Sequence, residues 1–173
     1  GVLGQDAIGK LRMMGFQVSG WSRSPRHLES VPCFSGSAGL QAFLAQTDIL
    51  VVLLPLTPDT KGIVKAGLLR GLARDGALGG PALINAGRGG LQVESDLVHC
   101  LDEGSLKEAV LDVFETEPLP ETSPLWTHPA VTVTPHNAAM SSPDAIGALV
   151  VAQIARLERG EPLHHQVEIA RGY

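Results

Sequence analysis

The sequence has few aromatic residues and few cysteines, and it lacks a long apolar segment. Phenylalanine, tryptophan and tyrosine make up 4% of the 173 residues, which disfavours a surface that stacks nucleic-acid bases. The two cysteines, Cys33 and Cys100, fit neither a metal-binding spacing nor a disulfide framework. No window approaches the roughly 20 apolar residues that a membrane-spanning helix needs. We therefore expect a reduced, cytoplasmic setting, no metal site and no membrane partner.

The sequence also lacks an excess of basic residues. It has 13 basic and 18 acidic side chains, which give a formal net charge of −5. A surface that binds nucleic acid is usually basic, so this balance argues against a nucleic-acid partner. Hydrophobic residues make up 44% of the chain, enough to form a core, and this excludes an intrinsically disordered protein.

Short aliphatic runs alternate along the chain with stretches of helical periodicity. The runs show little polar alternation, which is typical of strands in a parallel sheet that is covered on both faces. We predict strands over residues 16–21, 48–54, 82–86, 109–113 and 131–134. We predict helices over residues 7–14, 40–44, 94–101 and 143–159, with Gly15 and Gly160 as stops and Ser142 as a cap. This alternation predicts an α/β fold with a doubly wound parallel sheet.

In such a sheet, ligands bind beyond the carboxyl ends of the strands. Three of the five predicted strands are followed by a residue suited to chemistry, namely Arg88, Glu117 and His136. Each one taken singly is more often an ordinary turn residue. At successive exits of parallel strands they would meet on one rim, as a cation for a substrate anion, a carboxylate and a titrating imidazole. We therefore predict that these three residues form the catalytic set.

The chain opens with Gly1-Val2-Leu3-Gly4 directly before a predicted helix. These would be the last four residues of a G-x-G-x-x-G dinucleotide fingerprint. In that motif Gly1 lets the pyrophosphate approach the backbone, and Gly4 lets the helix pack closely. A bare G-x-x-G turn is more often a simple helix start, so this motif alone is a weak signal.

The residues Ser22-Arg23-Ser24, with Arg26 nearby, follow the first predicted strand. A site that prefers NAD has an acidic residue here, which accepts a hydrogen bond from the ribose 2′-hydroxyl. Hydroxyl and guanidinium groups would instead bind a 2′-phosphate. In the context of the predicted fold we expect NADPH/NADP as the cofactor, with NAD as the alternative. Without that fold, a solvated basic turn is the simpler interpretation.

Asp112 lies inside the apolar run 109–113. A carboxylate at the end of an apolar strand is costly unless it is paired or hydrogen-bonded. Two partners are equally compatible with the sequence: the nicotinamide end of a cofactor, or a backbone N–H of a neighbouring loop. The choice between them stays open at this point.

Taken together, these motifs resemble the cofactor-binding domain of the D-isomer-specific 2-hydroxyacid dehydrogenases. The segments that carry the resemblance are GVLG at 1–4, LPLTPDTKGI at 54–63, INAGRGG at 84–90, LDVFETEPLP at 111–120 and TPHNAA at 134–139. The resemblance implies a Rossmann fold in which Arg88 binds the substrate, Glu117 partners the histidine and His136 is the acid/base. It also implies that the dinucleotide is contacted by Val2, Leu3, Ser22, Arg23, Pro55, Thr60, Ala86, Asp112 and Ala138.

Three further segments, WSRSP at 21–25, PLW at 124–126 and ARGY at 170–173, resemble one subgroup of the family. Its members reduce small 2-oxo acids such as glyoxylate and hydroxypyruvate, mostly with NADPH. The resemblance therefore implies a small 2-oxo/2-hydroxy acid substrate and a homodimer. Two alternatives remain: a dehydrogenase-like corepressor that senses dinucleotide and controls assembly with transcription factors, and a family dehydrogenase for another substrate, such as formate or phosphoglycerate.

The resemblance also predicts a domain arrangement. Family members begin this domain with a central strand and the first fingerprint glycine, after a segment that forms most of a substrate domain. We expect residues 1–140 to be a Rossmann domain without its first strand. We expect residues 141–173 to be a helix and tail that pack on the substrate domain, within a polypeptide of about twice this length.

Overall fold

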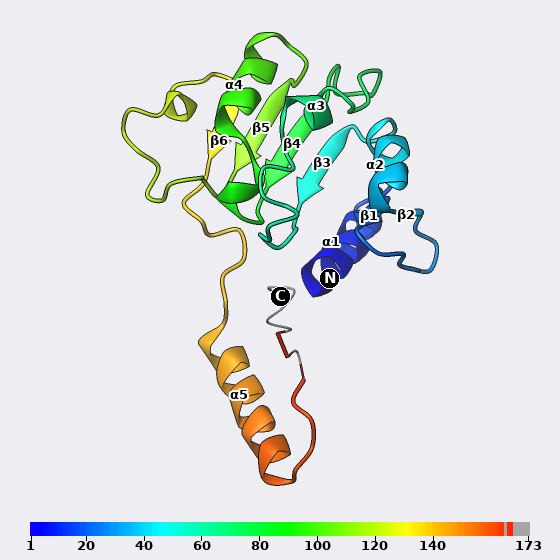
Figure 1. The fold of residues 1–173 in the computed structure, drawn as a ribbon, viewed down its shortest axis with the longest axis vertical. Helices are drawn as coiled ribbons and strands as arrows, with labels where there is room; N and C mark the ends of the chain where they lie inside the picture. Colours follow the sequence, from blue (N-terminus) through cyan, green and yellow to red (C-terminus); the bar gives the residue numbers. More distant parts are fainter. Residues whose placement is uncertain (165, 168–173) are drawn as a thin grey trace.

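The computed structural model describes residues 1–164 and 166–167 (Figure 1). The ARGY segment at 170–173 lies outside these residues. In chain order the elements are α1 (Val2–Met13), β1 (Gly20–Ser22), β2 (Cys33–Ser35), α2 (Gly36–Leu44), β3 (Ile49–Val52), α3 (Ala66–Leu69), β4 (Ala82–Asn85), the 3-10 turn η1 (Gly89–Leu91), α4 (Glu94–Asp102), β5 (Glu108–Leu111), the 3-10 turn η2 (Pro124–Trp126), β6 (Val131–Val133) and α5 (Pro143–Glu158). Within the described ranges, no helix is long and apolar enough to cross a membrane.

The strands form two parallel sheets. β3, β4, β5 and β6 pair in that order, and β1 pairs with β2. Every one of these pairs is parallel, which confirms the predicted α/β class. The doubly wound order 3-2-1-4-5-6 has a strand between the positions that β1 and β3 occupy. No strand of the described residues fills that position, so the sheet is divided there.

All five predicted strands are present, but their limits differ from the prediction, and the described residues contain a sixth strand, β2. The first prediction, residues 16–21, is wrong over 16–19, because pairing begins only at Gly20, which lies opposite Cys33. β2 was not predicted, since three residues with a cysteine and a serine give no strand pattern. α3 and both 3-10 turns were missed because they are too short for a helical period.

The predicted starts of the first two helices, residues 7 and 40, are wrong, because α1 begins at Val2 and α2 at Gly36. The helix ends that carry a glycine or cap signal agree with the prediction. Gly15 and Gly160 both have positive φ, +91° and +70°, as residues that follow a helix end often do. The Ser142 hydroxyl accepts a hydrogen bond from the backbone N–H of Ala145, which confirms it as the cap of α5. Local sequence signals therefore mark these helix ends correctly.

The hydrophobic core belongs to the four-stranded sheet and the helices that pack on it. Leu83 of β4, Leu111 of β5, Leu97 of α4 and Leu69 of α3 have no exposed surface. Burying one such side chain contributes about 1.5–3 kcal/mol. By contrast, α1 and α5 contain no buried residue, and α5 (orange) stands apart from the sheets in Figure 1. The stable frame is therefore the β3–β6 sheet.

The glycine-rich turn after β4 packs tightly between its neighbours. A Cβ at Gly87 would lie 3.1 Å from the carbonyl oxygen of Leu54, which follows β3. A Cβ at Gly89 would lie 1.7 Å from the carbonyl oxygen of Phe114, which follows β5. The turn is therefore wedged between the loops after β3 and β5, and only glycine fits at residue 89.

We expect Gly89→Ala to lower the free energy of unfolding by about 3 kcal/mol or more, at or above the usual cost of overpacking, because the methyl group meets backbone atoms that cannot rotate away. Chemical denaturation of the wild type and the variant, each expressed from the natural gene, measures this loss. Gly67→Ala in α3 is the matched control, since nothing lies within 4 Å of a Cβ there. That control should be neutral or slightly stabilising. Equal unfolding free energies for Gly89→Ala and wild type would contradict the tight packing.

Candidate active site

The exits of β4, β5 and β6 lie side by side because the three strands are parallel and in register. Asn85 of β4 is opposite Leu111 of β5, and Leu111 is opposite Val133 of β6. The loops that carry Arg88, Glu117 and His136 follow these strand ends. The sheet thus places the three predicted catalytic residues on loops at one edge, as the sequence predicted.

His136 and Glu117 are in direct contact. Nδ1 of His136 lies 2.7 Å from Oε2 of Glu117, while Oε1 of Glu117 accepts a hydrogen bond from the backbone N–H of Phe114 at 3.0 Å. The hydrogen bond to His136, and then that from Phe114, lower the pKa of Glu117. An ionised carboxylate only accepts hydrogen bonds, so Nδ1 of His136 must be the donor. This arrangement leaves Nε2 as the nitrogen that can exchange a proton with a substrate.

Asp112 holds the loop that carries His136. Asp112 is buried, with 5% of the residue exposed. Oδ1 accepts from the Thr134 hydroxyl and from the backbone N–H of Asn137 at 2.9 Å, and Oδ2 accepts from the backbone N–H of Ala138 at 3.0 Å. His136, between these donors, has φ +52°, a left-handed conformation that is uncommon for residues other than glycine. Asp112 therefore fixes the backbone on both sides of His136.

The pKa of Asp112 reflects the same contacts. Burial raises its pKa, but the hydrogen bonds from Thr134, Ala138 and Asn137 together outweigh burial, and the pKa is lowered overall. Of the two partners left open by the sequence, the loop N–H groups are thus present in the structure. The contact of Asp112 with a nicotinamide stays a prediction.

Arg88 is exposed at the same edge of the sheet. Its Nη1 donates to the carbonyl oxygen of Gly87 at 2.7 Å. Its positive charge also contributes to the lowered pKa of Glu117, although less than the two hydrogen bonds do. The edge therefore combines a guanidinium group able to bind an anion with a histidine whose tautomer is set by a carboxylate.

Sequence reasoning missed two buried amides beneath Arg88. Asn85 has no exposed surface and Gln92 is 2% exposed. Nδ2 of Asn85 lies 2.8 Å from Oε1 of Gln92. The only signal for Asn85 was a polar residue at the end of an apolar run, and Gln92 gave none. Sequence reasoning also missed Asp59, whose carboxylate lies 3.1 Å from Nη1 of Arg23.

The N-terminal motif begins α1, with Gly1 as the N-cap and Val2, Leu3 and Gly4 in the first turn. The expected close packing at Gly4 is not seen, since no described atom lies within 4 Å of a Cβ at Gly1 or Gly4. No strand of the described residues runs beneath this end of the helix, which explains the open space. Contacts of these residues with a dinucleotide stay a prediction.

The other predicted cofactor residues lie at the last residue of β1, which is Ser22, and on the turns after β1, β3, β4 and β6. The Ser22 hydroxyl donates to the carbonyl oxygen of Ser24 at 2.7 Å, and Arg26 is exposed. The Thr60 hydroxyl donates to the carbonyl oxygen of Pro55 at 2.7 Å. The Ala86 N–H donates to the carbonyl oxygen of Val52 at 3.2 Å, and the Ala138 N–H donates to Asp112, as described above. These residues form ordered turns, and their contacts with a cofactor stay a prediction.

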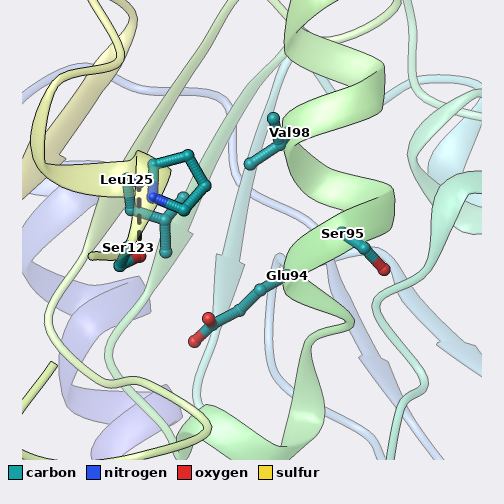
Figure 2. A pocket seen from close by; sticks show the side chains of 6 residues that line it. Glu94, Ser95, Val98, Ser123 and Leu125 are labelled. Carbon is teal, nitrogen blue, oxygen red and sulfur yellow. Dashed lines mark hydrogen bonds between the residues drawn. The ribbon is translucent and has the colours of Figure 1, made fainter. Parts of the chain in front are cut away.

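A pocket of about 410 Å³ lies elsewhere, between α4 and the η2 segment (Figure 2). Its lining residues are Glu94, Ser95, Val98, Ser123, Pro124 and Leu125. None of the predicted catalytic or cofactor residues lines this pocket, so it is not the candidate active site. In the described part of the chain, no group of three or more His, Cys, Asp or Glu residues could hold a metal ion.

The chain is similar to known proteins over its whole length. A family model described as the NAD binding domain of D-isomer specific 2-hydroxyacid dehydrogenases matches residues 1–138. A glyoxylate/hydroxypyruvate reductase A of Escherichia fergusonii is 46% identical over 173 residues, which are all of this chain and 54% of that protein. One of Serratia proteamaculans is 44% identical with the same coverage. The chain thus spans about half the length of these relatives.

The chain is also similar in fold and sequence to solved structures. The NADPH-dependent glyoxylate/hydroxypyruvate reductase of Sinorhizobium meliloti, in complex with NADP and sulfate, is 57% identical with a TM-score of 0.96. A probable 2-hydroxyacid dehydrogenase of Rhizobium etli, in complex with NADP, HEPES and L(+)-tartaric acid, is 54% identical with a TM-score of 0.94. Each match covers all of this chain and 54% of the other.

We expect Asp112→Asn to lower the free energy of unfolding by about 1–3 kcal/mol at pH 7, because the new amide places a donor opposite one of the loop N–H groups. The folded-state pKa of Asp112 lies below its ordinary value of 3.8. Its contribution is therefore fully present above that value and is lost as the pH falls through the folded-state pKa.

Urea unfolding of both proteins at several pH values between 3 and 7 measures this difference. The gap between wild type and Asp112→Asn should be constant near neutrality and should shrink at the acid end. Exposed Asp75→Asn is the matched control and should change little. A gap that widens as the pH falls would contradict the assigned contacts.

Proposed function

The chain belongs to the D-isomer specific 2-hydroxyacid dehydrogenase family, and we propose that it is the cofactor-binding part of an NADPH-dependent reductase of small 2-oxo acids, such as glyoxylate and hydroxypyruvate. The observation that carries the proposal is the His136–Glu117 contact of 2.7 Å at the sheet edge where Arg88 is exposed. The curated relatives of similar sequence have the same activity in their names.

In the proposed reaction, the Arg88 guanidinium binds the substrate carboxylate, since its planar fork matches two carboxylate oxygens. This contact orients the neighbouring carbonyl group toward His136. Protonated Nε2 of His136 gives its proton to the carbonyl oxygen, and ionised Glu117 stabilises the positive ring before the transfer. The hydride for the carbonyl carbon comes from the bound NADPH.

The groups of this chain suit a phosphorylated dinucleotide. Gly1, the N-cap of α1, has no side chain to cap the helix, so the first-turn N–H groups can face a pyrophosphate. Ser22 at the end of β1, and Arg23, Ser24 and Arg26 after it, provide hydroxyl and guanidinium groups and no carboxylate. These donors are chemically matched to a 2′-phosphate, so we assign NADPH rather than NADH.

The proposal also covers the end of the chain. We assign residues 1–140 to the Rossmann domain and residues 141–173 to a helix and tail that pack on another part of the protein. Support comes from α5, where six large apolar side chains are about half exposed or more: Ile146, Leu149, Val150, Val151, Ile154 and Leu157. An apolar stripe of this kind is normally buried against a partner surface. Assembly as a homodimer stays a prediction.

We expect His136→Ala to lower kcat about 10²–10⁴-fold, because the variant has no group to protonate the carbonyl oxygen. NADPH oxidation by the natural gene product with glyoxylate or hydroxypyruvate measures kcat. The KM for NADPH should change little, which distinguishes lost proton transfer from a damaged cofactor site. A variant that keeps most of the wild-type kcat would end the assignment of His136.

We expect Arg23→Gln to raise the KM for NADPH about ten- to a hundredfold, which corresponds to the loss of hydrogen bonds between charged groups. The KM for NADH should stay the same, since NADH has no 2′-phosphate. Arg74→Gln, at another exposed arginine, is the control. Equal effects of Arg23→Gln on both cofactors would contradict the proposed role.

A further inference from the structure

We propose that the buried amides of Asn85 and Gln92 are positioning residues that fix Arg88 relative to the His136–Glu117 pair. This inference rests on the proposed function and extends it to two residues that touch neither substrate nor cofactor in that proposal. The Arg88 side chain is exposed, whereas the backbone beneath it is held by two almost completely buried polar groups.

The hydrogen bonds of the two amides determine the orientation of each amide group. Oδ1 of Asn85 accepts from the backbone N–H of Gly87 at 3.1 Å, and Nδ2 donates to the carbonyl oxygen of Arg88 at 3.3 Å and to Oε1 of Gln92 at 2.8 Å. Nε2 of Gln92 donates to the carbonyl oxygen of Val113 at 3.1 Å. A flip of either amide would bring donor against donor or acceptor against acceptor, so only one orientation of the two amides forms all four hydrogen bonds.

These bonds connect the exit of β4 to the exit of β5, strands that lie side by side in Figure 1. From Arg88 the link runs through Asn85 and Gln92 to Val113. Val113 is followed by Phe114, whose N–H donates to Glu117 at 3.0 Å. Each step is a direct hydrogen bond or a covalent bond.

The glycine turn provides a second contact along the same path. Gly89 lies so close to Phe114 that a Cβ would be 1.7 Å from its carbonyl oxygen. The loops of Arg88 and Glu117 therefore meet both through the amide pair and through backbone packing. Packing keeps the two loops together, and the directional hydrogen bonds fix how far one is shifted along the other.

The buried amide pair has a role beyond stability. Two apolar side chains of similar volume would avoid burying the amides, but they would leave the N–H of Gly87 and the carbonyl oxygen of Val113 without these partners. A fully satisfied polar network instead selects one geometry over its close alternatives. Errors of about 1 Å in the placement of a catalytic group cost about a hundredfold in rate. The amide pair thus holds the backbone of the exposed Arg88 in one position.

The test is Gln92→Met in the natural gene product, assayed with NADPH and glyoxylate. We expect kcat/KM for the 2-oxo acid to fall about ten- to a hundredfold, mainly through a higher KM, because Arg88 binds the carboxylate. The KM for NADPH should not change. Gln92→Asn, which keeps an amide one methylene shorter, should fall between wild type and Gln92→Met, and it replaces Gln92→Met if the latter does not fold.

The matched control is Ser105→Ala. Ser105 is also buried, at 4% exposure, and its hydroxyl donates to Cys100 and Glu103. It precedes β5 and so lies at the opposite end of that strand from the active-site edge. We expect Ser105→Ala to lower the melting temperature without changing either KM.

A double-mutant cycle with Arg88→Gln separates positioning from stability. If Gln92 acts through Arg88, Gln92→Met has no further effect on kcat/KM once the guanidinium is absent. Additive losses, or a lower melting temperature with unchanged kcat/KM, would overturn the inference while leaving the proposed function intact. A folded wild type that oxidises neither NADPH nor NADH with any 2-oxo acid would overturn both.

Discussion

The parallel alignment of β4, β5 and β6 is the constraint on which the candidate active site depends. Because Asn85, Leu111 and Val133 lie in register, three loops from distant parts of the sequence leave the sheet at one edge. An antiparallel neighbour would send its loop to the opposite edge and remove one residue from the set. Strand direction therefore determines which loops meet at the candidate active site. The core leucines stabilise that direction.

Strand direction brings the loops together, but buried polar groups give each loop its conformation. Asp112 binds the backbone on both sides of His136, and the amides of Asn85 and Gln92 hold the turn of Arg88. Each group is costly to bury and is almost fully satisfied by loop donors and acceptors. The lowered pKa of Asp112, despite its burial, means that its hydrogen bonds outweigh the desolvation cost. The polar groups lie where the aliphatic strands end, which is where loops need to be fixed.

The sequence was sufficient to predict the features that have a repeating or local signal. The aliphatic runs located five strands, and the residues after them predicted the edge with Arg88, Glu117 and His136. It was insufficient where the cause is tertiary. β2 exists because Cys33 to Ser35 pair with β1, and Gln92 matters because Asn85 and Val113 lie next to it. The expected close packing at Gly4 was wrong for the same reason. A glycine motif predicts a backbone that other atoms can approach closely, but it does not predict which atoms lie there.

The division of the sheet gives special weight to the ion pair between Arg23 and Asp59. Arg23 follows β1 and Asp59 lies in the loop after β3, so the pair spans the two sheets where no strand of the described residues joins them. Both side chains are at least half exposed, and such a pair contributes at most about 1 kcal/mol. A 2′-phosphate carries more negative charge than one carboxylate and can displace it at small cost. A weak pair is therefore compatible with phosphate binding by Arg23, whereas a buried, strong pair would oppose it.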